Sequence, residues 1–399
     1  MLRIFVINTL SFLILPFLLV IYKVKKYNFY VLYNSVRIGH FALNVDIFLR
    51  RVLLNDIETR VHYFLVSPSK SSKGISNRFL HLMQMRYVKG LSNIHYIANS
   101  FLYHILVNIY LKNLAPKLFY TRYYETNEVE FSKTDRILNF KSNEYIEGSK
   151  QLKQIGIDIN NDKVVCIFAR DDAYLKLTMA SIDSSINWSY HNFRDMDVNN
   201  YIKSIKYLID KGYKVIRVGN IAKTPVNYSH DNFFDYSFSD IKSDFMDLFL
   251  IYISHFVVGN SSGMVDMATL FNKPLLIVNG VPFSHAPLGK KDMYISKKII
   301  DVESRSVVPF KKMINMNITD KALGEEQEFR NKFGLTYIDN TEEEIYSAIV
   351  DMVLYIDGKI NCNDATKEYF SKYWNFTKNS QIRSLVSPHW LENNKNLYY

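Results

Sequence analysis

The stretch that decides the fold of this chain is Asp244-Phe-Met-Asp-Leu-Phe-Leu-Ile-Tyr-Ile-Ser-His-Phe-Val-Val-Gly-Asn-Ser-Ser-Gly-Met-Val-Asp-Met-Ala-Thr-Leu-Phe-Asn-Lys-Pro-Leu-Leu-Ile-Val-Asn279. It predicts a helix over 244–254, a buried strand over 255–258, a Gly-Asn-Ser-Ser-Gly turn, a helix from Met264 and a strand over 275–278. A strand that enters a helix through small hydroxyl residues and glycine is typical of an anion site, because backbone N–H groups and the helix dipole favour a phosphate. Ser261, Ser262 and Gly263 are therefore candidate phosphate-binding residues, although parallel α/β units also turn ordinary corners in this way.

The residues upstream continue the same alternation. An apolar strand over 164–168 precedes Arg170 and Asp171, and a helix capped by Asp197 leads through Gly212 to a strand over 213–218. This order predicts a doubly wound parallel sheet, in which ligands bind outside the carboxyl ends of the strands. The polar candidates at or near those ends are Arg170, Asp171, Arg194, Arg217, Gly219 and the Ser-Ser-Gly turn.

Several motifs occur together between residues 164 and 282. They are Arg-Asp…Tyr, Asn-Phe-Arg-Asp-x-Asp, Gly-Tyr-x-Val-Ile-Arg-x-Gly, Gly-Asn-Ser-Ser-Gly and Pro-x-x-x-Val-Asn-x-Val-Pro-Phe. In this order the chain resembles a family of bacterial glycosyltransferases that are associated with surface polysaccharide biosynthesis and have a GT-B-like fold. The layout is also similar to that of GT-B fucosyltransferases. The resemblance implies an α/β protein with two Rossmann-like domains that face a cleft, the second of which binds a nucleotide-sugar donor.

The same resemblance implies that Arg170 and the hydroxyls of the Ser-Ser-Gly turn hold the donor diphosphate. Arg170 ends a buried strand, so its guanidinium needs an anionic partner, which is either Asp195 or the diphosphate. Arg194 either binds the donor or pairs with Asp195 to brace the loop. Arg217 has the same two alternatives.

Acidic residues complete the candidate donor site. Asp266 lies in the first turn of the helix after Ser-Ser-Gly, where a carboxylate either complements the helix dipole or binds sugar hydroxyls. Asp235-Tyr236 either contacts a base or ribose or forms a buried aromatic turn. The sequence shows no strand-end Asp-x-Asp motif with acidic partners and no His or Cys cluster. We therefore expect no metal or cofactor, with arginines, a helix N-terminus and hydroxyls neutralising the leaving diphosphate.

The first half of the chain alternates strands and helices in the same way. Strands are predicted over 29–33, 59–66 and 94–97, and helices over 41–54, 76–88, 99–111 and 143–155. We predict four parts: a membrane anchor (1–26), an acceptor-side Rossmann-like domain (27–156), a nucleotide-sugar-binding Rossmann-like domain (157–358) and a tail that crosses back to the N-terminal domain (359–399).

The candidate general base is His40, which follows Gly39 at the end of the first predicted strand. Imidazole titrates near neutral pH and can take a proton from an acceptor hydroxyl. The alternative is that His40 only packs or caps the following helix. Asp171 on the other domain and Asp46 are the rival bases.

Composition and charge narrow the class of partner. The chain has 399 residues, 48% of them hydrophobic, and two cysteines, Cys166 and Cys362, which form no disulfide framework. The net charge is +10, but no single element carries a basic stripe, so we expect no nucleic-acid partner. An anionic donor or an anionic membrane surface explains the positive charge more simply.

The N-terminal segment predicts membrane attachment. Residues 4–22 carry no charge, and Lys23, Lys25 and Lys26 follow them directly. That length just reaches the thickness of a bilayer, and the lysines place the body of the protein on the cytoplasmic side of the cytoplasmic membrane. Pro16 would kink a spanning helix, so a segment in the membrane interface is one alternative and a buried first element is another.

The function predicted is transfer of a sugar from a nucleotide-sugar donor to a glycan or lipid-linked acceptor in bacterial surface polysaccharide synthesis. Two other functions fit the same fold: a nucleotide-sugar epimerase, which needs neither acceptor nor membrane, and a non-catalytic glycan- or nucleotide-binding scaffold. The apolar N-terminal segment disfavours the epimerase, and the arginines predicted at the sheet edge disfavour the non-catalytic scaffold.

Overall fold

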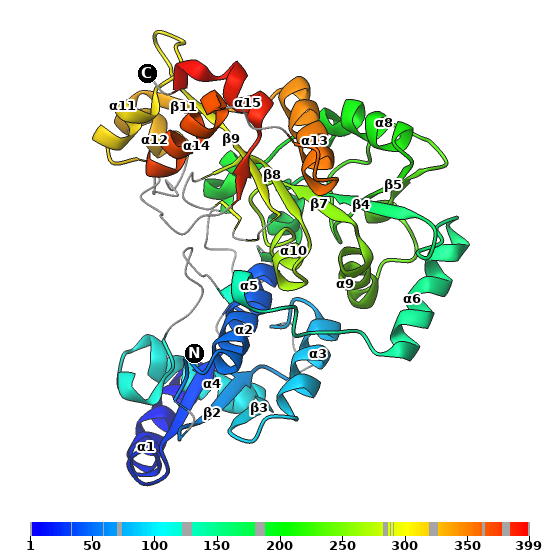
Figure 1. Ribbon diagram of the computed structural model, residues 1–399. Helices are drawn as coiled ribbons and strands as arrows, with labels where there is room; N and C mark the ends of the chain where they lie inside the picture. The colour runs from blue at the N-terminus through cyan, green and yellow to red at the C-terminus, as the bar shows by residue number, and fades with distance from the viewer. Residues whose placement is uncertain are drawn as a thin grey trace. The chain divides into compact units, whose positions relative to one another are not determined.

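The computed structural model describes residues 2–32, 34–58, 60–69, 74–121, 130–179, 188–281, 286, 287, 289, 291–318, 326–360, 364–376 and 384–397. The chain divides into two compact units, residues 1–140 and residues 141–399, and both have the α/β class that the sequence predicts (Figure 1).

The first unit is built on a parallel three-stranded sheet in the order β1-β2-β3. Asn77 and Asn99 cap the helices that follow β2 and β3, because their side-chain oxygens accept hydrogen bonds from backbone N–H groups of the first turn. The elements are α1 (Leu2–Lys25), β1 (Tyr27–Val31), α2 (Ile38–Leu53), β2 (His62–Ser67), α3 (Arg78–Val88), β3 (Ile94–Ala98), α4 (Ser100–Leu111), the 3-10 helix η1 (Pro116–Leu118) and α5 (Glu130–Lys133).

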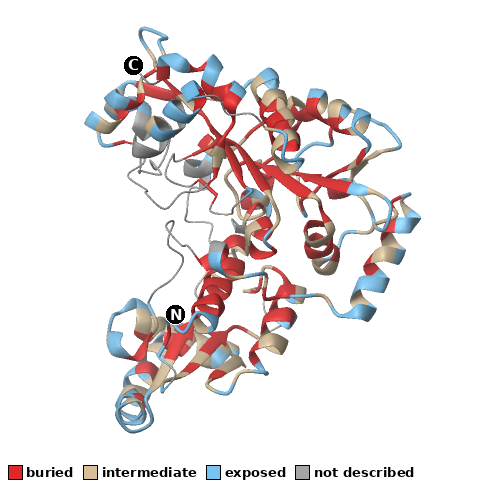
Figure 2. Ribbon diagram, viewed as in Figure 1, coloured by how far each residue is buried: buried red, intermediate tan, exposed pale blue. Residues whose placement is uncertain are grey.

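The predicted apolar N-terminal helix is present as α1. Its segment Phe5–Lys25 is long and apolar enough to cross a membrane, and Pro16 lies inside it. One side of α1 packs on α4, whereas most of the other side is exposed (Figure 2). The helix is therefore neither a detached tail nor a buried core element.

The second unit is built on a seven-stranded sheet in the order β12-β9-β8-β7-β4-β5-β6, with every pairing parallel. Its strands are β4 (Lys163–Ile167), β5 (Tyr213–Arg217), β6 (Phe233–Asp235), β7 (Phe256–Gly259), β8 (Leu275–Gly280), β9 (Met293–Ser296) and β12 (Leu385–Val386). A separate antiparallel pair joins β10 (Lys298–Asp301) to β11 (Leu335–Ile338). The central strands are buried along their whole length, as in parallel sheets covered on both faces (Figure 2).

Helices cover this sheet on both sides. Helices α8 and α13 pack together over one face, and α9 and α10 pack together over the other (Figure 1). The helices are α6 (Ser142–Gln154), η2 (Leu175–Met179), η3 (Trp188–Arg194), η4 (Val198–Tyr201), α8 (Ile202–Asp210), η5 (Tyr236–Phe238), α9 (Asp244–Ile253), α10 (Asp266–Leu270), α11 (Phe310–Asn315), α12 (Glu326–Phe333), α13 (Glu342–Ile356), α14 (Asp364–Phe376), α15 (Pro388–Asn393) and η6 (Lys395–Leu397).

The division between the units differs from the predicted linker. It falls before α6, not after it, because α6 packs on α9 of the second unit. At Gly148 an added Cβ would lie 2.3 Å from the Phe249 ring, so glycine permits this close approach.

The tail expected to cross back to the N-terminal domain instead belongs to the second unit. Strand β12 adds to the edge of the seven-stranded sheet beside β9, and α15 packs on α13. Asp351 of α13 holds this turn by accepting hydrogen bonds from the Ser387 hydroxyl at 2.5 Å and the His389 backbone N–H at 3.1 Å. Of the two cysteines, Cys166 is a buried free thiol, and Cys362 lies outside the described residues.

Candidate active site

The strand order of the second unit defines one crevice where its connections change direction. Strand β4 comes first in this sheet, and it lies between β5 on one side and β7 on the other. The connection that leaves the carboxyl end of β4 leads to β5, and the one that leaves β7 leads to β8 in the opposite direction along the sheet. Open α/β sheets bind ligands at such a switch point. Arg170 follows β4 and the Asn-Ser-Ser-Gly turn follows β7, so the two predicted motifs meet there.

Asn260 ties the motifs together. Its side-chain oxygen accepts a hydrogen bond from the Arg170 backbone N–H at 2.8 Å, and its side-chain nitrogen donates to the Arg194 carbonyl at 2.6 Å. The Met196 backbone N–H donates to the Arg170 carbonyl at 3.1 Å. Asn260 is fully buried, so one amide side chain fixes the loop after β4 and the loop after η3 on the end of β7.

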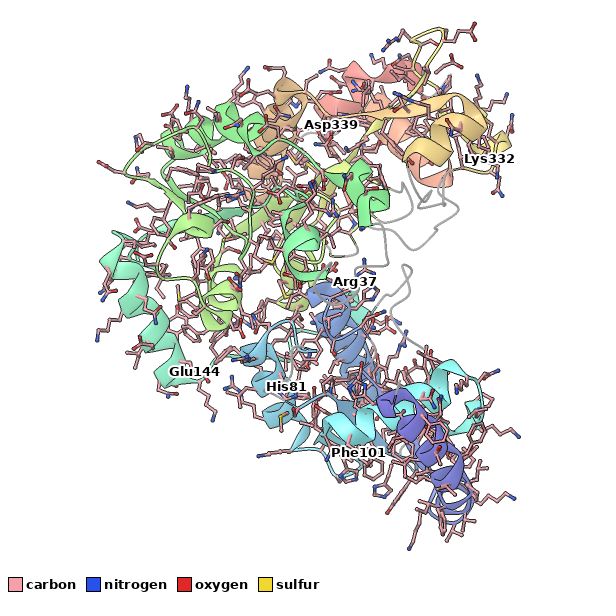
Figure 3. All side chains as sticks on the ribbon, turned by 180° about the vertical axis from the view of Figure 1, so that it is seen from behind. Arg37, His81, Phe101, Glu144, Lys332 and Asp339 are labelled. Carbon is pink, nitrogen blue, oxygen red and sulfur yellow. The ribbon has the colours of Figure 1, made fainter. Side chains whose placement is uncertain are left out.

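Positive charge gathers at this edge of the sheet. Arg170 is 8% exposed, and its guanidinium group forms an ion pair with Asp195. Lys297, directly after β9, is 3% exposed, and its ammonium group donates to the Asp195 carbonyl at 3.2 Å and to Asp339 at 2.5 Å (Asp339 is labelled in Figure 3). Each of these cations already has a carboxylate partner, so an anionic ligand would bind here by taking the place of a carboxylate such as Asp195.

The two serine hydroxyls of the Ser-Ser-Gly turn differ in their hydrogen bonding. The Ser261 hydroxyl oxygen accepts a hydrogen bond from the Val281 backbone N–H at 3.1 Å, which ties the turn to the end of β8. The Ser262 hydroxyl oxygen is buried and has no hydrogen-bond partner among the described residues. A buried polar atom without a partner is costly, so Ser262 is the hydroxyl suited to a ligand.

The helix after this turn is shorter than predicted. Helix α10 begins at Asp266, not Met264, and has five residues, about one and a half turns. A helix of five residues has only a small dipole. An anion at this site must therefore be bound by side chains and not by the end of the helix. The turn is tight because Val265 packs over Gly259, where an added Cβ would lie 2.5 Å from the valine side chain.

Asp266, in the first turn of α10, lies within electrostatic reach of Arg194. Burial raises the pKa of its carboxyl group to about 7, and the positive charge of Arg194 opposes that rise. A carboxyl group that is partly protonated near neutral pH repels a diphosphate less than an ordinary carboxylate does. Asp266 can therefore sit close to an anion and exchange hydrogen bonds with hydroxyl groups.

Two other predicted site residues hold the edge together. Asp171 accepts hydrogen bonds from the backbone N–H groups of Ala173 at 2.9 Å and Lys223 at 2.8 Å, which use both of its oxygens. Gly219 has a φ of +136°, and an added Cβ would lie 3.2 Å from the Phe168 ring. Both residues shape the loops beside Arg170.

Arg217 lies at the end of β5 and is 1% exposed. It donates to Asp235 at 3.1 Å, and Asp235 also accepts from the Val226 backbone N–H at 3.0 Å. The neighbouring Tyr236 is fully buried, and its hydroxyl donates to Asp247 at 2.6 Å. Tyr236 is therefore part of a buried turn and Arg217 is paired with Asp235, whereas donor binding by Arg217 or Asp235 stays a prediction.

In the first unit, His40 lies half-buried in the first turn of α2, which follows the carboxyl end of β1. The N-cap of α2 is Arg37 and not His40. Asp46 is 1% exposed, and its carboxylate accepts from the Arg50 Nε at 2.6 Å. Asp46 is thus part of a buried ion pair, which removes it as a rival base.

Sequence reasoning missed Asn260 and Lys297 as site residues. Asn260 opens the quoted turn motif, and a polar residue directly after a buried strand was the available signal. Lys297 carried no such signal, because the four-residue strand β9 before it is too short to stand out in the sequence.

Comparisons with known proteins complete the description. No protein-family model matches the chain, and no curated protein matches it. The chain is similar to a solved structure titled glycosyl transferase family 9 from Veillonella parvula DSM 2008, with a TM-score of 0.41 and 11% identity over 76% of this chain and 94% of that chain. It is also similar to E. coli ADP-heptose lps heptosyltransferase II, with a TM-score of 0.37 and 12% identity over 67% of this chain and 90% of that chain. Both similarities are weak, and the case for a function rests on the residues of this chain.

Proposed function

We propose that this chain is a glycosyltransferase that moves a sugar from a nucleotide-sugar donor to a glycan or lipid-linked acceptor in bacterial surface polysaccharide synthesis. The second unit binds the donor and the first unit binds the acceptor, as in a GT-B-like arrangement. The protein works without a metal at the cytoplasmic membrane, with its body on the cytoplasmic side.

One observation carries the proposal: buried cations and an unpartnered hydroxyl converge at the switch point of a parallel sheet. Arg170, Lys297 and Ser262 supply two positive charges and a hydroxyl there. When a glycosidic bond to a nucleoside diphosphate breaks, negative charge develops on the leaving diphosphate. Preorganised donors aimed at that charge lower the barrier, and a removed donor typically costs about 3–4 kcal/mol.

The ion pair of Arg170 suggests how a donor enters. The Arg170 side chain is 9% exposed and the Asp195 side chain is 24% exposed, so the carboxylate is the more accessible partner. A diphosphate that displaces Asp195 replaces one anion by another and leaves no buried cation unpaired. Asp195 is then free to bind hydroxyl groups of the sugar.

For the general base we propose His40 of the first unit, which takes a proton from the acceptor hydroxyl as that oxygen attacks the sugar. Asp171 is the weaker candidate because both of its oxygens already accept backbone N–H groups. Its part in catalysis would be to hold the loop of Arg170.

The test is a donor screen on the full-length protein. Nucleoside diphosphate release is measured with a panel of nucleotide sugars, with and without EDTA, and binding of each free nucleoside diphosphate is measured in parallel. Turnover that survives EDTA is expected. Binding without any release would favour the scaffold, and release or interconversion of the sugar without an acceptor requirement would favour the epimerase.

The two serines of the turn provide a matched pair of variants. Ser262→Ala should weaken donor binding about tenfold with an unchanged free energy of unfolding, because its hydroxyl has no hydrogen-bond partner in the part of the chain that the structure describes. Ser261→Ala should lower the free energy of unfolding by about 1–3 kcal/mol, because the buried Val281 N–H loses its acceptor. Equal affinities in wild type and Ser262→Ala would contradict this donor site.

A further inference from the structure

Helix α1 has two faces of different character. The face that packs on the first unit, here the docked face, carries residues three or four positions apart: Asn8, Ser11, Ile14, Leu15, Leu18 and Tyr22. The free face carries large apolar side chains that are 57–71% exposed: Phe5, Phe12, Leu13, Phe17, Val20 and Val24. An apolar face of this size is not left in water by a soluble unit, so it indicates an interaction surface.

The docked face is held by specific polar contacts as well as by packing. The Asn108 side chain of α4 donates to the Ser11 hydroxyl at 2.9 Å, and the Lys112 ammonium donates to the Asn8 side chain at 2.7 Å. Ser11 is fully buried. Helix α1 therefore has a defined position on α4 within the first unit.

Leaving this position would uncover an apolar cluster. Leu18 belongs to one apolar cluster with buried residues of the sheet, of α4 and of η1 with the residue after it: Phe29, Val31, Val66, Ile105, Leu106, Ile109, Leu118 and Phe119. Helix α4 also exposes Phe101, which is labelled in Figure 3, and Leu111. An α1 helix that detached to cross a bilayer alone would transfer this cluster to water at about 25 cal/mol per Å².

Length alone does not separate spanning from lying flat. The 21 residues Phe5–Lys25 extend about 32 Å, close to the roughly 30 Å of a hydrocarbon core. If α1 spanned while docked, α4 with its contacts from Asn108 and Lys112 would have to enter the hydrocarbon as well. The docked geometry is compatible with a helix that presents only its free face to lipid.

The net positive charge of the first unit indicates that the lipid surface is anionic. The first unit has 18 Lys and Arg residues against 7 Asp and Glu, a net charge of +11, whereas the second has 31 against 32, a net charge of −1. No acidic residue occurs before Asp46, and Lys23, Lys25 and Lys26 are exposed at the end of α1. Each basic residue near an anionic bilayer contributes about 1 kcal/mol to binding.

We infer that α1 lies in the plane of an anionic bilayer while it stays docked on α4, with its free face in the lipid, and that it does not span the membrane. Helix α1 is apolar around most of its circumference, and it has a single lipid-facing side only because the first unit covers the other side. A helix that lies in the interface buries its apolar face about 5–10 Å into the headgroup boundary. The inference rests on the membrane location proposed above, but its test needs no donor, acceptor or turnover.

The decisive measurement is depth. Single cysteines replace Phe5, Phe12, Phe17 and Val24 in a full-length protein whose Cys166 and Cys362 are serine, and each carries a fluorescent label. Quenching by brominated lipids in vesicles of phosphatidylcholine and phosphatidylglycerol is expected to place all four labels at one shallow depth. Labels at 12 and 17 near the bilayer centre, with 5 and 24 at opposite surfaces, would overturn the inference.

An engineered disulfide that fixes α1 on α4 tests whether the helix stays docked when the protein binds a membrane. A disulfide between Ser11→Cys and Asn108→Cys should form and leave vesicle binding unchanged, because the docked state is the bound state. Loss of binding in the oxidised protein, restored by reduction, would show that α1 must detach.

Two surface variants test the free face. Phe17→Asp should weaken binding to anionic vesicles at least about tenfold. The matched control is Ile146→Asp, an equally exposed apolar residue (68%) on α6 of the second unit, which should bind as wild type does. Wild-type binding of Phe17→Asp, or vesicle binding replaced by self-association through this face, would also overturn the inference.

Discussion

The first unit carries a net charge of +11 and the second a net charge of −1, although the two are built from similar parallel α/β alternations. The first unit shows its positive charge mainly at the surface, together with an exposed apolar helix face. The second unit has balanced charges, and the cations that matter most, Arg170 and Lys297, are buried at one edge of its sheet. The excess positive charge of the first unit is thus mostly solvated, whereas Arg170 and Lys297 of the second unit are buried and paired with carboxylates.

Buried ion pairs also differ between the units. In the first unit Arg50 and Arg51 are fully buried inside α2 and are bound by Asp46, Glu130, Thr134 and Tyr120. In the second unit Asp195, which binds Arg170, is partly exposed. Removing one partner of a sealed pair leaves a buried group without its partner and costs stability, whereas a pair with one accessible partner can exchange that partner for a ligand.

The largest expected effect concerns the chemistry assigned to the first unit. His40→Asn should lower sugar transfer at least about 10²-fold, the usual contribution of a general base, with nucleoside diphosphate binding unchanged. Steady-state transfer and equilibrium binding are both measured. The control is His230→Asn on the exposed surface of the second unit, and transfer within about threefold of wild type in His40→Asn would remove the first unit from the chemistry.

Breaking the sealed pair should cost stability. Arg50→Met should lower the free energy of unfolding by about 3–5 kcal/mol, because Asp46 keeps a buried charge and the carbonyls of Thr134 and Asp135 lose a donor. Chemical denaturation measures the loss. The double variant Asp46→Leu with Arg50→Met should recover part of it, and a loss below about 1 kcal/mol would mean that the pair is not sealed in solution.

The boundary between the units is tested at α6. Gly148→Ala should lower the stability of the second unit by about 2–3 kcal/mol, because the new methyl group meets the Phe249 ring. Tryptophan fluorescence reports on the second unit alone, since Trp188, Trp374 and Trp390 all lie there. Lys150→Ala, at an exposed position of the same helix, is the control. If Gly148→Ala left the unfolding transition seen by tryptophan fluorescence unchanged, α6 would not be part of the second unit.

The smallest effect expected is on the pH dependence of stability. Folding raises the pKa of Asp266 from 3.8 to about 7, so between those values the folded state binds more protons and its stability falls as the pH rises. Asp266→Asn removes that loss and should gain on the order of 1–2 kcal/mol over wild type at pH 8, but little at pH 4.

Unfolding free energies at the two pH values measure the difference. Asp231→Asn on the exposed surface is the control for a changed net charge. A gain from Asp266→Asn that is the same at both pH values would show that the carboxyl group is not held in its protonated form.

Much of the architecture follows from local sequence. Continuous apolar runs predicted β4, β7 and β8 to within one or two residues, because strands buried on both faces contain few polar residues. Strand β5, which contains Lys214, was predicted to within one residue after the glycine that ends the helix before it. Asp197 caps the 3-10 helix η4 that leads into α8, and Gly212 follows the end of α8 with a φ of +83°. Short elements were missed where four residues carry too little periodicity, as in β9, and α10 was predicted too long.

The candidate site was predicted in part for a similar reason. Arg170 and the Ser-Ser-Gly turn each follow a buried strand, so the sequence already placed them at carboxyl ends of a parallel sheet. It could not tell which of the two serines is free, because the partner of Ser261 is a backbone N–H twenty positions away at Val281.

The sequence by itself determined the α/β class, the apolar N-terminal helix and the meeting of an arginine with a hydroxyl turn, since these depend on periodicity and residue type over short spans. Tertiary structure alone decided the rest. It paired Arg170 with Asp195, brought Lys297 to the same edge, sealed Asp46 against Arg50 and docked α1 on α4. The physical reason is that the free energy of a charge or an apolar face depends on what surrounds it, and those neighbours come from segments far apart in the chain.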